Sequence, residues 1–117
     1  MLYESSKHEV LKDIDWCEDT VRSMINSIFD DTLNNFDSEN FWMTAKDEDS
    51  DIDVNKTVYY GASGTIYALE EISHFLDREL PFNLVEIMDK VYSDYLLAPD
   101  TKEVVPSLFL GEVGILL

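Results

Sequence analysis

The sequence predicts an all-α fold built from stacked helical hairpins. Three stretches carry apolar residues at helical spacing, and a Gly-x-x-Gly motif recurs after 50 residues. A helix, a turn, a second helix and a loop fit between the two copies, and a period of this size is typical of helical-hairpin repeats. The 117 residues match one ordinary domain, and 45% of them are apolar, which is enough for a packed core.

The first helix is predicted over residues 8–30. Its apolar residues alternate spacings of four and three, so they share one face. They are Val10, Ile14, Cys17, Val21, Met24 and Ile28, with Leu11, Ile25 and Phe29 widening the stripe. Because Cys17 belongs to this stripe, we expect it to be a buried structural thiol.

Residues 31–57 show no helical period and are expected to form a mobile acidic loop of the single domain 1–117. Phe41-Trp42-Met43 is an apolar island inside this loop, and we expect it to pack against the core as a short strand. The acidic run that follows resembles the start of an EF-hand, with Asp49, Asp51 and Asp53 at the first three ligand positions.

That resemblance fails further along. Val54 stands where the sixth position needs glycine, and Tyr60 stands where the twelfth needs glutamate. We therefore interpret the run as a solvated loop, with a weak cation site or a basic partner as the alternative.

Two further helices are predicted over 62–77 and 82–97, separated by Pro81 and ended by Pro99. Their expected buried residues are Ile66, Leu69, Ile72, Phe75 and Leu76, and then Leu84, Ile87, Met88, Val91, Tyr95 and Leu96. A fourth helix is expected to begin near Glu112. The apolar end that follows suggests the front part of a longer protein, although it can also dock into a groove of a complete small protein.

The repeat aligns Tyr59-Tyr60-Gly61-Ala62-Ser63-Gly64 with Phe109-Leu110-Gly111-Glu112-Val113-Gly114. Glycine inside a helix costs about 1 kcal/mol relative to alanine, so four glycines at these positions need a structural reason. We expect Gly61 and Gly111 to take the backbone turn that starts a helix, and Gly64 and Gly114 to let a neighbouring backbone approach closely. A phosphate-binding loop is excluded, because no lysine follows either copy.

Val58-Tyr59-Tyr60-Gly61-Ala62-Ser63-Gly64 and Ser107-Leu108-Phe109-Leu110-Gly111-Glu112-Val113-Gly114-Ile115 resemble the repeat of the lanthionine synthetase C-like (LanC-like) proteins. The resemblance implies a partial α/α toroid in which each Gly-x-x-Gly copy opens an inner helix. It also implies that a full-length protein catalyses zinc-dependent thioether (lanthionine) cyclisation of a dehydrated ribosomal peptide. Two alternatives stay open. One is a zinc-free toroid or an acidic helical module that acts as a peptide-binding, protein-binding or regulatory domain, and the other is a fragment of a carbohydrate-active α/α toroid.

No residue of the chain matches the family's catalytic or zinc-binding residues. The family holds zinc with two cysteines and a histidine, whereas this chain has Cys17, a terminal His8 and His74 at the edge of an apolar face. We therefore expect no cofactor in this chain, and zinc only in a full-length protein. Tyr59 and Tyr60 are candidate peptide contacts at the toroid's mouth, although core packing with the hydroxyl at the edge is the favoured interpretation.

Charge and the C-terminal edge bear on partners and location. The 25 acidic and 8 basic residues give a net charge of −17, which disfavours nucleic acid and anionic membranes as partners. A polar N-terminus without a signal peptide and a single cysteine favour the cytoplasm. We expect later repeats of the same protein, a peptide substrate, or self-association at the C-terminal edge formed by Leu108, Phe109, Val113, Ile115, Leu116 and Leu117.

Overall fold

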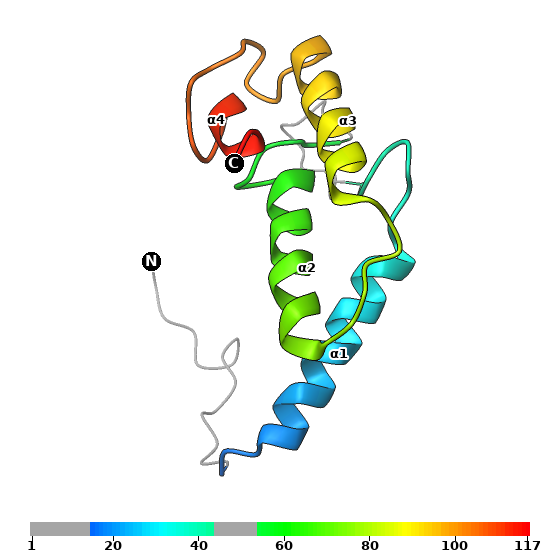
Figure 1. Ribbon diagram of the computed structural model, residues 1–117. Coiled ribbons are helices and arrows are strands. Elements are labelled where there is room, and N and C mark those ends of the chain that lie inside the picture. The colour runs from blue at the N-terminus through cyan, green and yellow to red at the C-terminus, as the bar shows by residue number, and fades with distance from the viewer. Residues whose placement is uncertain (1–14, 44–53) are drawn as a thin grey trace, which may run out of the picture.

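The computed structural model describes residues 15–43 and 54–117. Four helices occupy this part of the chain: α1 (Glu18–Asn34), α2 (Ala62–Leu76), α3 (Leu84–Leu97) and α4 (Glu112–Ile115). α2 runs opposite to α1 and α3, and α4 lies near the loop that precedes α2 (Figure 1). The described residues contain no strand, only an isolated bridge between Asp37 and Phe41, so the predicted all-α class is confirmed for them.

α1 differs from its prediction at both described ends. Residues 15–17 are not helical, and the helix extends through Asn34, four residues into the predicted loop; residues 8–14 lie outside the described residues. Cys17 has an extended backbone at the N-cap position. Glu18 and Asp19 then fill the first turn, where carboxylates interact favourably with the helix dipole.

The described part of the predicted apolar stripe of α1 is buried only at Phe29, and Val21 and Ile25 are half-buried. Phe29 is fully buried, whereas Met24 and Ile28 are 60% and 59% exposed. Cys17 is also exposed, so the expectation of a buried structural thiol is wrong. The physical reason is that α1 packs against α2 along the side that carries Phe29, and no other described helix packs extensively on the opposite side.

The end of α2 fixes its position against α1. Asp77 has a left-handed backbone, its N–H donates to His74 O, and the N–H of Arg78 donates to Ser73 O. This pair of hydrogen bonds is a Schellman motif. It directs the Arg78 guanidinium to Asp30, at 2.7 Å, and places it 4.6 Å from the centre of the Phe29 ring.

The other two predicted helices agree closely with the structure. α2 ends one residue before its prediction, and α3 begins two residues after, because the side chain of Asn83 accepts hydrogen bonds from the N–H groups of Val85 and Glu86. The prediction that Phe75 and Leu96 are buried is wrong. Phe75 is 52% exposed, with the Arg22 guanidinium 4.7 Å from its ring centre, and Leu96 is 46% exposed.

The core lies where α2, α3 and α4 meet. Its buried members are Phe41, Ala62, Ile66, Ile87, Val91, Tyr95 and Ile115. Because Ile115 is only 3% exposed, its assignment to an exposed C-terminal edge is wrong, while Leu116 and Leu117 are exposed as expected.

The apolar island partly behaves as predicted. Phe41 is buried and Trp42 packs against the core, whereas Met43 is 65% exposed. No strand forms, because Asp37 closes a tight turn by accepting hydrogen bonds from the N–H groups of Glu39 and Asn40. The acidic residues of the EF-hand comparison up to Asp53 lie outside the described residues.

Candidate functional site

The two Gly-x-x-Gly loops have the same local geometry. We name residues 55–64 the first loop and residues 105–114 the second loop. The N–H of Ala62 donates to Asn55 O at 2.9 Å, and the N–H of Glu112 donates to Val105 O at 3.1 Å. The glycine at each helix start also has nearly the same backbone angles, with φ of −134° at Gly61 and −146° at Gly111. Each loop therefore folds back on its own helix start in the same way.

Close backbone approach accounts for all four glycines. A Cβ atom at Gly61 or Gly111 would overlap the backbone of the residue six positions earlier, and so would one at Gly64 or Gly114. Gly61 and Gly111 stand at the N-caps of α2 and α4, where the repeat predicts that a helix starts. Their φ values are open to any residue, and no described glycine has a positive φ.

The two loops lie side by side and contact each other at equivalent positions. The N–H of Tyr59 in the first loop donates to Phe109 O in the second loop at 3.0 Å. The Cγ2 atom of Val58 lies 2.7 Å from the point that a Cβ atom of Gly114 would occupy. The first loop therefore offers an N–H and an apolar side chain, and the second loop receives them.

α3 and the residues after it hold both loops in place. Asp100, which follows α3, accepts hydrogen bonds from the N–H groups of Lys56 and Thr57 at 2.7 and 2.8 Å. Lys56 Nζ donates to Ala98 O and lies 3.6 Å from Asp100 Oδ1, with both charged side chains largely buried. The buried Tyr95 hydroxyl accepts a hydrogen bond from the N–H of Val105 in the second loop.

An apolar groove lies between the outward side chains of the two loops. Tyr59, Tyr60, Phe109 and Leu110 line it, and its volume is about 240 Å³. Tyr59 and Tyr60 are 65% and 67% exposed and pack edge to face, with ring centres 4.5 Å apart. The favoured prediction of core packing for these two tyrosines is wrong, because the fold-back buries Thr57 and Ala62 on either side and turns the rings outward.

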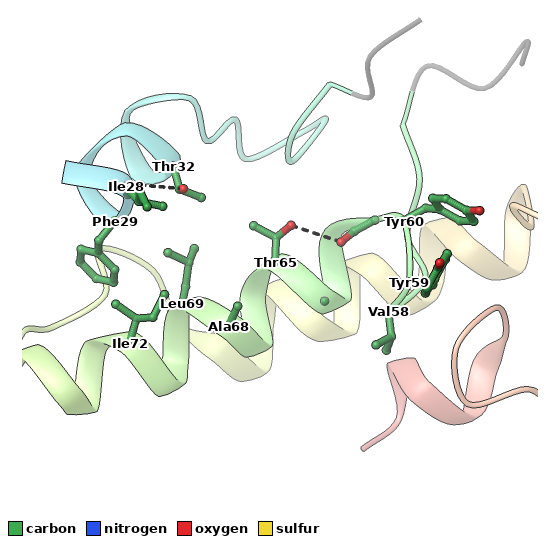
Figure 2. Close-up of a pocket in the computed structure, with 12 residues that line it drawn as sticks. Ile28, Phe29, Thr32, Val58, Tyr59, Tyr60, Thr65, Ala68, Leu69 and Ile72 are labelled. Atoms are coloured by element: carbon green, nitrogen blue, oxygen red, sulfur yellow. Dashed lines mark hydrogen bonds between the residues drawn. The ribbon is translucent and has the colours of Figure 1, made fainter. Parts of the chain in front are cut away.

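A second cavity of about 380 Å³ lies between α1 and α2. Its lining includes Ile28 and Thr32 of α1, Gly64, Thr65, Ala68, Leu69 and Ile72 of α2, and Tyr59 and Tyr60 of the first loop. Figure 2 shows the tyrosines at one end of this lining, Phe29 and Ile72 at the other, and Val58 turned toward α4. The cavity thus includes Gly64 and lies between the first loop, α2 and α1.

The part of the chain that the structure describes contains no set of residues that fits a zinc site. Among residues 15–43 and 54–117, no group of three or more His, Cys, Asp or Glu side chains is placed to hold a metal ion. Cys17 lies at the start of α1 and His74 in the last turn of α2. The pKa of the Cys17 thiol is lowered, because the Thr20 hydroxyl and the N–H groups of Thr20 and Asp19 favour the thiolate.

Sequence patterns missed the groups that hold the loops. No sequence signal links Lys56 to Asp100, which are 44 residues apart, or Tyr95 to Val105. The glycines, by contrast, were visible as a repeat.

No protein-family model, curated protein or solved structure matches the chain. None of the helices that the structure describes is long and apolar enough to span a lipid bilayer.

Proposed function

We propose that this chain forms the first hairpins of a LanC-like α/α toroid and that its aromatic groove contacts a peptide substrate. The observation that carries the proposal is the direct pairing of two equivalent loops, with Tyr59 bonded to Phe109 and each loop opening a helix. Tandem hairpins that stack in this way bring their helix starts to one end of the assembly. A substrate at that end meets the side chains that the loops turn outward.

The groove suits an apolar peptide side chain. Two tyrosine rings, a phenylalanine and a leucine form its walls, and the tyrosine hydroxyls can hydrogen-bond to a peptide backbone. The net charge of −17 favours a cationic peptide over an anionic one at low salt. Since the described residues do not fit zinc, this chain's role is to bind and orient the peptide, and we assign it no step of the cyclisation.

The test is an NMR titration of the chain with a synthetic cationic peptide that contains dehydroalanine, cysteine and two leucines. We expect shift changes centred on Tyr59, Tyr60 and Phe109, and binding weakened at least tenfold by Tyr59→Ala with Tyr60→Ala. Tyr67→Ala is the matched control, because Tyr67 is 64% exposed on α2 and lies outside the groove. Equal weakening by the control, or no binding, would overturn the proposed contact.

A carbohydrate-active toroid is the second candidate, because exposed aromatic rings such as those of Tyr59 and Tyr60 also stack on sugar faces. The same titration with maltoheptaose separates the two. Chemical-shift changes at the tyrosines with the sugar, and none with the peptide, would favour a carbohydrate-active toroid. A longer form of the protein that binds the peptide without cyclising it would instead favour the zinc-free binding module.

A further inference from the structure

The contact between the two loops defines two complementary faces. The leading face of a loop is an apolar side chain followed by a backbone N–H, as in Val58 and Tyr59. The receiving face is a backbone carbonyl with a glycine three residues into the helix, as in Phe109 and Gly114. Each loop carries both faces, and the contact within the chain uses one face of each.

The leading face of the second loop is unused in the described part of the chain. Its apolar side chain is Leu108, the counterpart of Val58, which is 44% exposed. Its N–H is that of Phe109, the counterpart of Tyr59, and it has no partner among the described residues. This face therefore carries an unsatisfied donor and an uncovered leucine.

The receiving face of the first loop is unused as well. The three atoms nearest to a Cβ position at Gly64 are all backbone atoms of Val58, whereas at Gly114 the second nearest is the Val58 Cγ2 atom. In place of such a side chain, Gly64 borders the cavity of about 380 Å³, whose lining also includes Ala68. The carbonyl of Tyr59 accepts no hydrogen bond from residues 15–43 or 54–117.

We propose that a second copy of this chain docks head to tail between these two faces. Leu108 of one copy seats against Gly64 and Ala68 of the next, and the N–H of Phe109 donates to the carbonyl of Tyr59. The contact already formed within the chain is the template for this interface. Because both loops have the same backbone geometry, the leading face of the second loop in one copy matches the receiving face of the first loop in another copy.

Such an interface is heterologous, so two docked copies together still have one free leading face and one free receiving face, and assembly continues into a chain or closes into a ring. The net charge of −17 opposes assembly, and salt screens that repulsion over about 8–10 Å at physiological ionic strength. We therefore expect assemblies that grow with protein concentration and with added sodium chloride. This inference concerns the chain's contact with itself and does not depend on the proposed function.

Analytical ultracentrifugation of three variants at 0.05 and 0.5 M sodium chloride tests the interface. Leu108→Glu blocks the leading face and Ala68→Glu blocks the receiving face, and each is expected to weaken association at least tenfold. Leu97→Glu is the control with the same change of charge, because Leu97 is 84% exposed at the end of α3. Circular dichroism melts of all three variants check that each substitution leaves the chain folded.

Mixing the two blocked variants is the decisive measurement. Each keeps the face that the other lacks, so an equimolar mixture should form a heterodimer and stop there. A mixture that stays monomeric, or association that survives Ala68→Glu, would overturn the head-to-tail geometry. Wild-type protein that is monomeric at both salt concentrations would overturn the interface itself. Peptide binding measured on the Ala68→Glu variant keeps this outcome separate from that of the proposed function.

Discussion

At the scale of single residues, the missing Cβ atoms of the glycines let each loop pass close to the helix that follows it. Gly64 and Gly114 have ordinary backbone angles for a helix, yet a single added carbon at either would overlap the backbone of the preceding loop. The sequence signal for these positions is the spacing of the glycines. The reason for it is the path of the loop six residues earlier.

Gly64→Ala is predicted to lower the free energy of unfolding by about 1–3 kcal/mol, the usual cost of overpacking. The added Cβ overlaps backbone, which cannot rotate away as a side chain can. Glu71→Ala, at an exposed position of the same helix, is the control, and we expect a change within about 0.5 kcal/mol. Urea melts decide this, and an unchanged midpoint for Gly64→Ala would place that glycine on an open surface.

Cys17 should be alkylated by iodoacetamide at a lower pH than an ordinary cysteine. Its lowered pKa means that the thiolate, the reactive form, persists below the pH at which an unperturbed thiol is protonated. Thr20→Val removes the hydroxyl that contributes most to this shift, so its alkylation profile should move to higher pH. The same profile in urea gives the unperturbed reference, and coincidence of the folded and unfolded profiles would contradict the prediction.

At the scale of helices, the ends and the contacts between helices are set by a few polar groups. Asn83 starts α3, Asp77 ends α2, and Arg78 connects the end of α2 to α1. The Asn83 side chain accepts hydrogen bonds from two N–H groups, the Asp77 N–H donates to the His74 carbonyl, and the Arg78 guanidinium donates to Asn26 and Asp30. Single substitutions at these helix ends should therefore change the free energy of unfolding measurably.

Asp77→Gly is expected to stabilise the protein by about 0.5 kcal/mol. Asp77 has φ of 53°, a left-handed conformation that costs residues with a Cβ atom about 1–2 kcal/mol and costs glycine little. The gain is reduced because glycine also loses more chain entropy on folding. Asp77→Val should have the opposite sign, since a branched Cβ fits this conformation poorly. Thermal melts that rank Val above Gly would refute this account of the helix end.

Arg78→Ala is predicted to destabilise the protein by about 1–2 kcal/mol. It removes a partly exposed ion pair with Asp30, worth up to about 1 kcal/mol, and a cation–π contact with Phe29 of similar size. Arg22→Ala is the matched control, because Arg22 also lies over a ring but pairs with Glu18 only at 3.8 Å. Because Arg22 and Phe75 also join α1 to α2, equal effects of the two substitutions in urea melts would show that the close ion pair with Asp30 adds nothing to the cation–π contact.

At the scale of the whole molecule, α3 organises the two loops. Its Tyr95 hydroxyl and the Asp100 that follows it bind backbone N–H groups of the second and first loops, respectively. These contacts join segments 10 to 44 residues apart and put the loops in register for the Tyr59–Phe109 hydrogen bond. The aromatic groove and both faces of the proposed interface depend on that register.

Asp100→Ala is expected to cost about 3 kcal/mol and to speed hydrogen exchange at the Tyr59 amide. It removes the acceptor of two backbone N–H groups and leaves the Lys56 ammonium buried without its counter-ion. Lys56→Met should cost less, because Asp100 keeps both N–H donors and the methionine fills a similar space. A larger cost for Lys56→Met, or unchanged exchange at Tyr59, would contradict the role given to Asp100.

The helical class, the bounds of α2 and α3 within two residues, and the structural need for paired glycines could all be predicted from sequence patterns. These features rest on local periodicity, on prolines and on backbone contacts between residues six apart. Which apolar residues are buried, by contrast, depends on how the helices pack against one another. The stripe of α1 carries Met24, Ile28 and Phe29 alike, and contact with α2 buries Phe29 alone. Tertiary structure also decided that Tyr59 and Tyr60 face outward, because the Asp100 contact that sets the loop's path joins residues that no periodicity relates.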